Sequence, residues 1–157
     1  MIKVNVVAVG RVKEKYFSEA ISEYVKRLGK YCEIKIIETP EENFTKVDDG
    51  LIKTIIAKEA EKILPHLKGH VYAMAIEGKP TSSQSFSSEI KGLIDSGEGV
   101  FTFVIGGSYG LSEEIKKRAN KLFSFSPMTF PHTLFRVMLL EQIYRAFSII
   151  GGSGYHK

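Results

Sequence analysis

The chain has 157 residues, of which 43% are hydrophobic and 25% charged, a composition typical of an ordinary globular protein. No apolar run approaches the roughly 20 residues that cross a bilayer, and Met1-Ile2-Lys3-Val4 lacks the layout of a signal peptide. We therefore expect one cytoplasmic domain over residues 1–157, without a membrane partner.

The formal net charge of +4 is mild, but the basic residues form three clusters that suit a polyanion such as a nucleic acid. They are Arg11, Lys13 and Lys15; Lys26, Arg27 and Lys30; and Lys116, Lys117, Arg118 and Lys121. Solvated helix faces carry lysines just as often, so charge alone leaves both interpretations open. The single cysteine, Cys32, lies among alternating apolar residues and is predicted to be a small buried side chain.

Three strand-and-helix units are predicted in the first two thirds of the chain. Strands are predicted over residues 2–9, 31–37 and 71–76. Each is followed by apolar residues at helical spacing, which begin near Phe17, Ile52 and Phe86. Asp48 and Asp49 are candidate caps of the second helix, and Thr81-Ser82-Ser83-Gln84 fits a capping box that opens the third.

The remaining third predicts an unbroken apolar strand over 100–105, a helix that starts at Ser112-Glu113-Glu114, and a strand over 122–125. Strands that alternate with helices predict an α/β fold, with a mostly parallel sheet of five to six strands covered on both faces. The acidic segment from Thr39 to Asp49 is interpreted as a mobile surface connection.

A last helix is predicted over residues 133–150, and its apolar residues leave only a narrow polar strip of Arg136, Glu141, Gln142 and Arg145. One small sheet cannot cover so much apolar surface. We expect this helix to pack against a second copy of the chain, as in a homodimer; burial within a monomer is the alternative.

Two uncharged loops follow neighbouring strands, where open α/β sheets bind ligands. In the first, Gly106, Gly107 and Gly110 allow backbone amides to approach a ligand, although the spacing matches neither a Rossmann fingerprint nor a P-loop. In the second, Pro127 and Pro131 stiffen a loop that runs from Ser126 to His132, which could bind a flat group such as adenine.

The histidines differ in what their surroundings allow. His66 and His70 are four residues apart, but Pro65 and Gly69 break the helix that a shared metal would need, so no metal site is expected. His156 lies in a glycine-rich tail with Tyr155 and Lys157, where a partner could order it as a proton acceptor. A frayed terminus is the alternative.

Several motifs together resemble the ribosomal large-subunit methyltransferase H family of the SPOUT superfamily, over essentially the whole chain. They are Ala8-Val9-Gly10-Arg11 with Lys13-Glu14-Lys15-Tyr16, Phe103-Val104-Ile105-Gly106-Gly107-Ser108, Phe125-Ser126 with Met128-Thr129-Phe130-Pro131-His132, Glu141-Gln142 with Tyr144-Arg145-Ala146, and Tyr155-His156.

The resemblance implies an S-adenosylmethionine-dependent enzyme that methylates N3 of a pseudouridine in 23S rRNA on the ribosome. It also implies a homodimer with a C-terminal trefoil knot. The implied cofactor residues are Met74, Gly106, Phe125, Ser126, Pro127, Met128, Thr129 and Phe130. Met74 stands where a leucine is expected, and Pro127 has no amide hydrogen to donate.

By the same resemblance, Arg145, Tyr155 and His156 would face the acceptor base, completed by the other subunit. His156 is our hypothesised base or relay, and Arg145 a phosphate or carbonyl anchor. Two rival functions remain: a Rossmann-type enzyme that uses Gly10 and Glu38 for its nucleotide, and a noncatalytic module that binds rRNA through the basic clusters.

Overall fold

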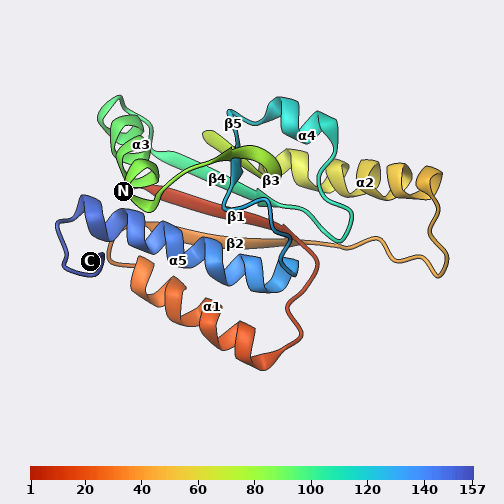
Figure 1. Ribbon diagram of the computed structural model, residues 1–157, viewed down its shortest axis with the longest axis horizontal. Coiled ribbons are helices and arrows are strands. Elements are labelled where there is room, and N and C mark those ends of the chain that lie inside the picture. The colour runs from red at the N-terminus through yellow and green to blue at the C-terminus, as the bar shows by residue number, and fades with distance from the viewer.

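The computed structural model describes all residues from 1 to 157 as one five-stranded sheet with helices on both faces (Figure 1). The strands are β1 (Lys3–Val9), β2 (Glu33–Thr39), β3 (His70–Pro80), β4 (Val100–Ile105) and β5 (Lys121–Ser124). They lie in the order β2-β1-β4-β3-β5, and every neighbouring pair is parallel. The predicted α/β class and strand positions are confirmed, while the knot stays a prediction.

The helices are α1 (Lys15–Leu28), α2 (Asp49–Ile63), α3 (Ser83–Asp95), α4 (Glu113–Arg118) and α5 (His132–Ile150), with a short 3-10 turn at Leu64–His66. The Asp48 carboxylate accepts from the Leu51 amide at 2.8 Å and caps α2, as predicted. The cap of α3 differs from the prediction by one residue, because Ser82 rather than Thr81 accepts from the Ser85 amide. No helix is long and apolar enough to span a membrane.

Alternating side chains of the strands divide the core into two layers. On β1, Val4, Val6 and Ala8 pack in the layer that includes α5, whereas Val7 and Val9 pack in the layer that includes α2 and α4. In the first layer, α5 lies beside both α1 and α3 (Figure 1). Cys32 is buried there, and burial raises the pKa of its thiol to about 12, which leaves it a packing residue.

Candidate active site

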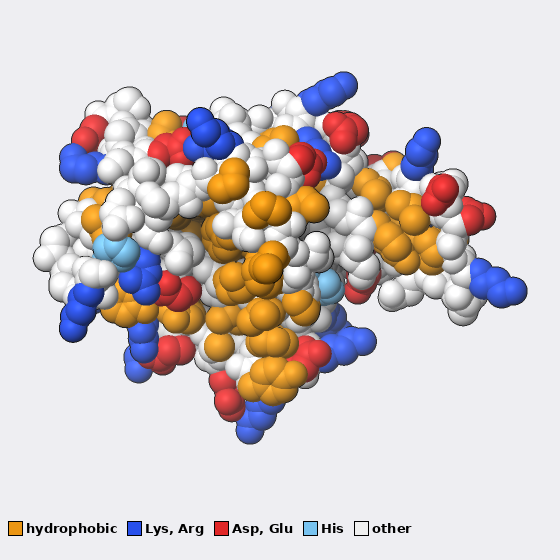
Figure 2. All heavy atoms as spheres, viewed as in Figure 1, with side chains coloured by type: hydrophobic (Ala, Val, Ile, Leu, Met, Phe, Trp, Pro, Cys, Tyr) orange, Lys and Arg blue, Asp and Glu red, His pale blue; other side chains and the backbone are white.

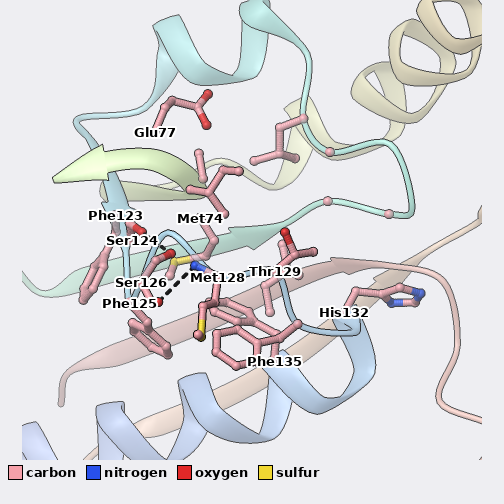
Figure 3. Close-up of a pocket in the computed structure, with 18 of the residues that line it drawn as sticks. Met74, Glu77, Phe123, Ser124, Phe125, Ser126, Met128, Thr129, His132 and Phe135 are labelled. Carbon is pink, nitrogen blue, oxygen red and sulfur yellow. Dashed lines mark hydrogen bonds between the residues drawn. The ribbon is translucent and has the colours of Figure 1, made fainter. Parts of the chain in front are cut away.

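A cavity of about 440 Å³ opens at the carboxyl ends of β3, β4 and β5 (Figure 3). Seven of the eight residues predicted to bind a cofactor line it: Met74, Gly106, Phe125, Ser126, Met128, Thr129 and Phe130. Pro127 is the exception and lies outside the lining. The two loops singled out from sequence therefore form one cavity, together with Phe135 of α5.

The glycine loop is a tight turn that requires glycine at two positions, Gly106 for close packing and Gly110 for its backbone conformation. A Cβ at Gly106 would lie 2.6 Å from the carbonyl carbon of Gly110, closer than two such atoms can approach. Gly110 donates its amide to the Gly107 carbonyl at 3.1 Å and has a φ of 82°, in the left-handed region. The turn thus exposes backbone to the cavity on one side.

The second loop is held by its own serines. The Ser124 hydroxyl donates to the Ser126 carbonyl at 3.1 Å, and the Met128 amide donates to the Ser126 hydroxyl at 3.0 Å (Figure 3). Phe125 packs against Phe135, with ring centroids 4.9 Å apart. The loop is therefore ordered before any ligand arrives, which lowers the entropy lost on binding.

Arg136 ties the N-terminal end of α5 to the ends of β1 and β2. Its burial corrects the prediction that it is a polar surface residue. The helical pattern predicts Arg136 on the polar strip of the last helix, but the side chain is buried, with 1% of its surface exposed. Its guanidinium donates to the Glu38 carboxylate at 2.6 Å and to the Gly10 carbonyl at 3.3 Å. The helical pattern could not reveal this pair, because its partners lie about a hundred residues away in sequence.

The acidic connection after β2 is also more ordered than predicted. The Glu42 amide donates to the carboxylate of Glu59, a buried residue of α2, at 3.2 Å, and the Ser108 hydroxyl donates to Glu41 at 3.3 Å. A Cβ at Gly107 would lie 3.4 Å from Glu59. Burial raises the pKa of the Glu59 carboxyl. The connection thus contacts the glycine turn from outside the cavity.

One ion pair, missed from sequence, lies at the cavity. Lys116 of α4 and Glu77 of β3 both line it, with the ammonium 2.5 Å from the carboxylate. The hydrogen bond from Lys116 lowers the pKa of Glu77, and the same bond raises the pKa of Lys116. Both groups therefore stay charged near neutral pH, in an otherwise mostly uncharged lining.

The three predicted catalytic residues lie together at the other end of α5. Arg145 donates to the Glu141 carboxylate at 2.9 Å, and its guanidinium lies 4.7 Å from the centre of the Tyr155 ring. The Tyr155 hydroxyl also donates to Glu141, at 2.8 Å. Burial, followed by this bond, raises the pKa of Tyr155 to about 12. Glu141 thus organises the cluster, a role that sequence reasoning did not assign to it.

His156 completes this cluster through Arg145. An Nη atom of Arg145 lies 3.0 Å from Nδ1 of the His156 ring. A guanidinium has only donors, so Nδ1 acts as the acceptor and the proton of the neutral ring lies on Nε2. The tail that carries Tyr155 and His156 is therefore anchored to α5 and is not a frayed end.

The cavity and the cluster do not meet within one chain. Arg145 follows Phe135 by ten residues of α5, which is about 15 Å along a helix axis. A second cavity, of about 340 Å³, lies between them and is lined in part by Phe125, Met138 and Glu141. The chain therefore separates the cavity from the cluster of Glu141, Arg145, Tyr155 and His156.

Gly10 and Glu38 do not form the Rossmann-type site of the first rival function. Neither residue lines the cavity. The Glu38 carboxylate already accepts from buried Arg136 and from the Val12 amide at 3.3 Å. Glu38 therefore holds Arg136 and the chain after β1 in place, away from the cavity. No group of three or more His, Cys, Asp or Glu side chains is arranged to hold a metal ion.

The fold and cavity define a class: α/β proteins that bind a small ligand at the carboxyl edge of a parallel sheet. The chain belongs to the SPOUT methyltransferase family, whose model, described as a predicted SPOUT methyltransferase, matches residues 2–156. The protein is thus a methyltransferase, and the family uses S-adenosylmethionine. The noncatalytic alternative is thereby wrong.

Curated relatives match the chain over nearly its whole length, and solved structures share its fold. Proteins named ribosomal RNA large subunit methyltransferase H from Limosilactobacillus reuteri and Bifidobacterium adolescentis are 47% and 48% identical, over 99% of this chain and 100% of theirs. A probable methyltransferase from Bordetella pertussis shares the fold with a TM-score of 0.57 at 12% identity, over 93% of this chain and 95% of that one. A Legionella pneumophila methyltransferase with bound SAM has a TM-score of 0.51 at 14% identity. The match covers 92% of this chain and 66% of that one.

Proposed function

We propose that this protein transfers the methyl group of S-adenosylmethionine to N3 of a pseudouridine in 23S rRNA of the large ribosomal subunit, in the cytoplasm. The observation that carries the proposal is the cavity itself, because its lining contains seven residues expected to hold the cofactor. The relatives named for large-subunit rRNA support the substrate.

The cavity fits S-adenosylmethionine in size and character. Its volume of about 440 Å³ lies within the range of roughly 300 to 1,000 Å³ for small-molecule sites. Met74, Gly106 and the loop 125–130 would surround the nucleoside with apolar side chains and main-chain groups. The Glu77 and Lys116 pair offers charges complementary to an amino acid's ammonium and carboxylate.

A mostly neutral cavity also suits the reaction. The bound cofactor supplies a methyl group on a positively charged sulfur, and transfer to a nitrogen anion removes both charges. The protein therefore needs alignment more than a charged clamp, and alignment can be worth effective molarities of about 10⁵ to 10⁸ M. Pro127 stiffens the loop without contributing an amide donor.

His156, Arg145 and Tyr155 would handle the acceptor base. The Nε2–H of His156 can donate to a carbonyl beside N3, which stabilises the imide anion. If Arg145 turns from His156 to a phosphate or carbonyl of the RNA, Nδ1 becomes free to accept the imide proton. Tyr155 keeps its proton near neutral pH, given its raised pKa, and so remains a donor.

A homodimer would bring the two separated regions together. Apolar side chains gather over the N-terminal halves of α1 and α5 (Figure 2). Tyr16 of α1 and Met128 of the loop before α5 are both exposed. An exposed apolar surface of this kind is typical of an interface. In a two-fold dimer, the cluster of one protomer would face the cavity of its partner, across the gap that a single chain leaves open.

The direct test is methylation of ribosomes that lack the modification. Purified protein with methyl-labelled cofactor should label 23S rRNA at one pseudouridine, located by mapping the labelled fragment. The His156→Ala variant should bind the cofactor normally but transfer its methyl group far more slowly. Labelling of another RNA, or of no RNA by folded protein that binds the cofactor, would contradict the proposed substrate.

A further inference from the structure

Two basic side chains at the C-terminal end of α1, Arg27 and Lys30, lie against tyrosine rings beside the catalytic cluster. The Arg27 guanidinium is 5.5 Å from the centre of the Tyr24 ring and 5.8 Å from that of Tyr144. The Lys30 ammonium is 5.0 Å from the Tyr31 ring centre and 5.9 Å from that of Tyr144. These five residues are called the cation–tyrosine patch.

One of the two cations of the patch, Lys30, has no countercharge in the fold, and the other, Arg27, has only an exposed one. Lys30 has no carboxylate within ion-pair distance. Glu23 is the only carboxylate that pairs with Arg27, at 3.0 Å, and both side chains are about half exposed. An exposed pair of this kind is weak and exchanges readily for a stronger anion. The aromatic rings meanwhile hold both cations in place.

The patch is continuous with the catalytic cluster. Tyr144 meets Tyr155 edge to face, with centroids 4.8 Å apart, and Arg145 lies over the Tyr155 ring. Figure 2 shows blue side chains beside a pale-blue histidine over the C-terminal ends of α1 and α5. A polyanion that reaches His156 would therefore pass Arg27 and Lys30.

We propose that the cation–tyrosine patch binds phosphates of the rRNA segment that flanks the target nucleotide. The inference rests on the proposed function and names where the substrate docks. N3 lies on the pairing edge of the base, so the target must be unpaired when it reacts. Unpaired RNA offers phosphates to the cations and bases to the half-buried rings of Tyr24 and Tyr31.

The test removes the charges of Arg27 and Lys30 and measures how the rate of methyl transfer depends on the concentrations of RNA substrate and salt. With ribosomes lacking the modification, Arg27→Gln/Lys30→Gln should raise KM for the RNA substrate about tenfold and leave kcat unchanged. The slope of log(kcat/KM) against log salt should become shallower by about 1.4, since each phosphate contact to a single strand contributes roughly 0.7. Arg27→Lys/Lys30→Arg should keep the wild-type slope.

The matched control removes two charges elsewhere. Lys53→Gln/Lys58→Gln, on α2, loses the same net charge, and Lys58 also lies near an aromatic ring, 5.9 Å from Phe44. This control should keep the wild-type KM and slope. Equal behaviour of the two double variants would overturn the proposal, as would loss of the dimer on sedimentation of Arg27→Gln/Lys30→Gln, which would assign the patch to protein contact.

The outcome is separable from that of the proposed function. If wild-type protein transfers no methyl group to the ribosomes, the proposed function fails. The same variants are then compared for direct binding of the labelled 23S rRNA at several salt concentrations. An unchanged affinity and salt slope in Arg27→Gln/Lys30→Gln would overturn the docking surface on its own.

Discussion

The two ends of α5 carry regions that differ in charge: a mostly neutral cavity at the N-terminal end and a charged cluster at the C-terminal end. At its N-terminal end, the cavity is formed by turns whose hydrogen bonds are short-range and whose lining is mostly neutral. At its C-terminal end, Arg145, Tyr155 and His156 are joined by charged hydrogen bonds to Glu141 or to each other. One helix therefore holds the cavity and the charged cluster at a fixed separation, and in our proposal the first binds the cofactor and the second acts on the acceptor base.

This contrast predicts that substitutions separate into two kinds. Changes at the cavity should reduce cofactor affinity, since that region is preorganised for a ligand. Changes at the cluster should reduce the rate of methyl transfer and leave cofactor affinity intact. Gly106→Val and Glu141→Gln test this division directly, and substitutions at Glu38 and Glu59 test the contacts that support the cavity from outside.

The largest effect is expected from Gly106→Val. Its side chain would enter the space of the Gly110 backbone, and relief of the overlap would deform the turn at a cost of up to about 3 kcal/mol. Cofactor affinity by calorimetry should fall on the order of a hundredfold. Gly99→Ala, where a Cβ meets nothing within 4 Å, should bind normally. A fully active Gly106→Val would place the cofactor elsewhere.

Glu141→Gln should act at the other end of the helix. Its loss of charge loosens both Arg145 and Tyr155, and misplacement of about 1 Å can slow a reaction by up to a hundredfold. Single-turnover methyl transfer should fall about thirtyfold, with cofactor affinity within twofold of the wild type. Asp95→Asn breaks an exposed ion pair with Lys91 and serves as the control. Equal loss of affinity and rate would show that the two regions are not independent.

Glu38→Gln should reduce stability more than function. It leaves the buried guanidinium of Arg136 without a countercharge, yet Glu38 itself is 40% exposed, so water compensates in part. The loss should be about 1.5 kcal/mol in chemical denaturation, below the 3–5 kcal/mol of a fully buried pair. Arg136→Met, which leaves only a partly solvated carboxylate, should cost less. The reverse order would contradict this account of the pair.

Glu59→Gln should have the smallest effect, visible in its pH dependence. The raised pKa of Glu59 means that the folded state binds its proton more tightly than the unfolded state. Stability is therefore lost as pH rises from the ordinary carboxyl value through the raised one. Relative to wild type, the melting temperature of Glu59→Gln should rise by a few degrees between pH 4 and pH 7. Glu41, Glu42 and Lys62 face the same group and are unchanged in both proteins, so their contributions largely cancel. A pH-independent difference would contradict the assignment.

Much of the fold could be predicted because its signals are local. The strand at residues 100–105 and the Asp48 cap each depend only on residues adjacent in sequence. The two loops are recognisable from glycines and prolines that follow predicted strands. The burial of Arg136, the contact of Glu59 with the glycine turn, and the Glu77 and Lys116 pair were not predictable. Each joins residues distant in sequence, and a charged residue in a helical pattern is read as exposed.

The central claim, that the cavity of one protomer works with the cluster of its partner, is tested by mixing two inactive variants. Gly106→Val and His156→Ala, co-expressed with different tags, should form mixed dimers with one intact composite site. Random pairing of the two chains should restore about a quarter of wild-type methyl transfer. No recovery in mixed dimers verified by tandem purification would show that cavity and cluster act within the same chain.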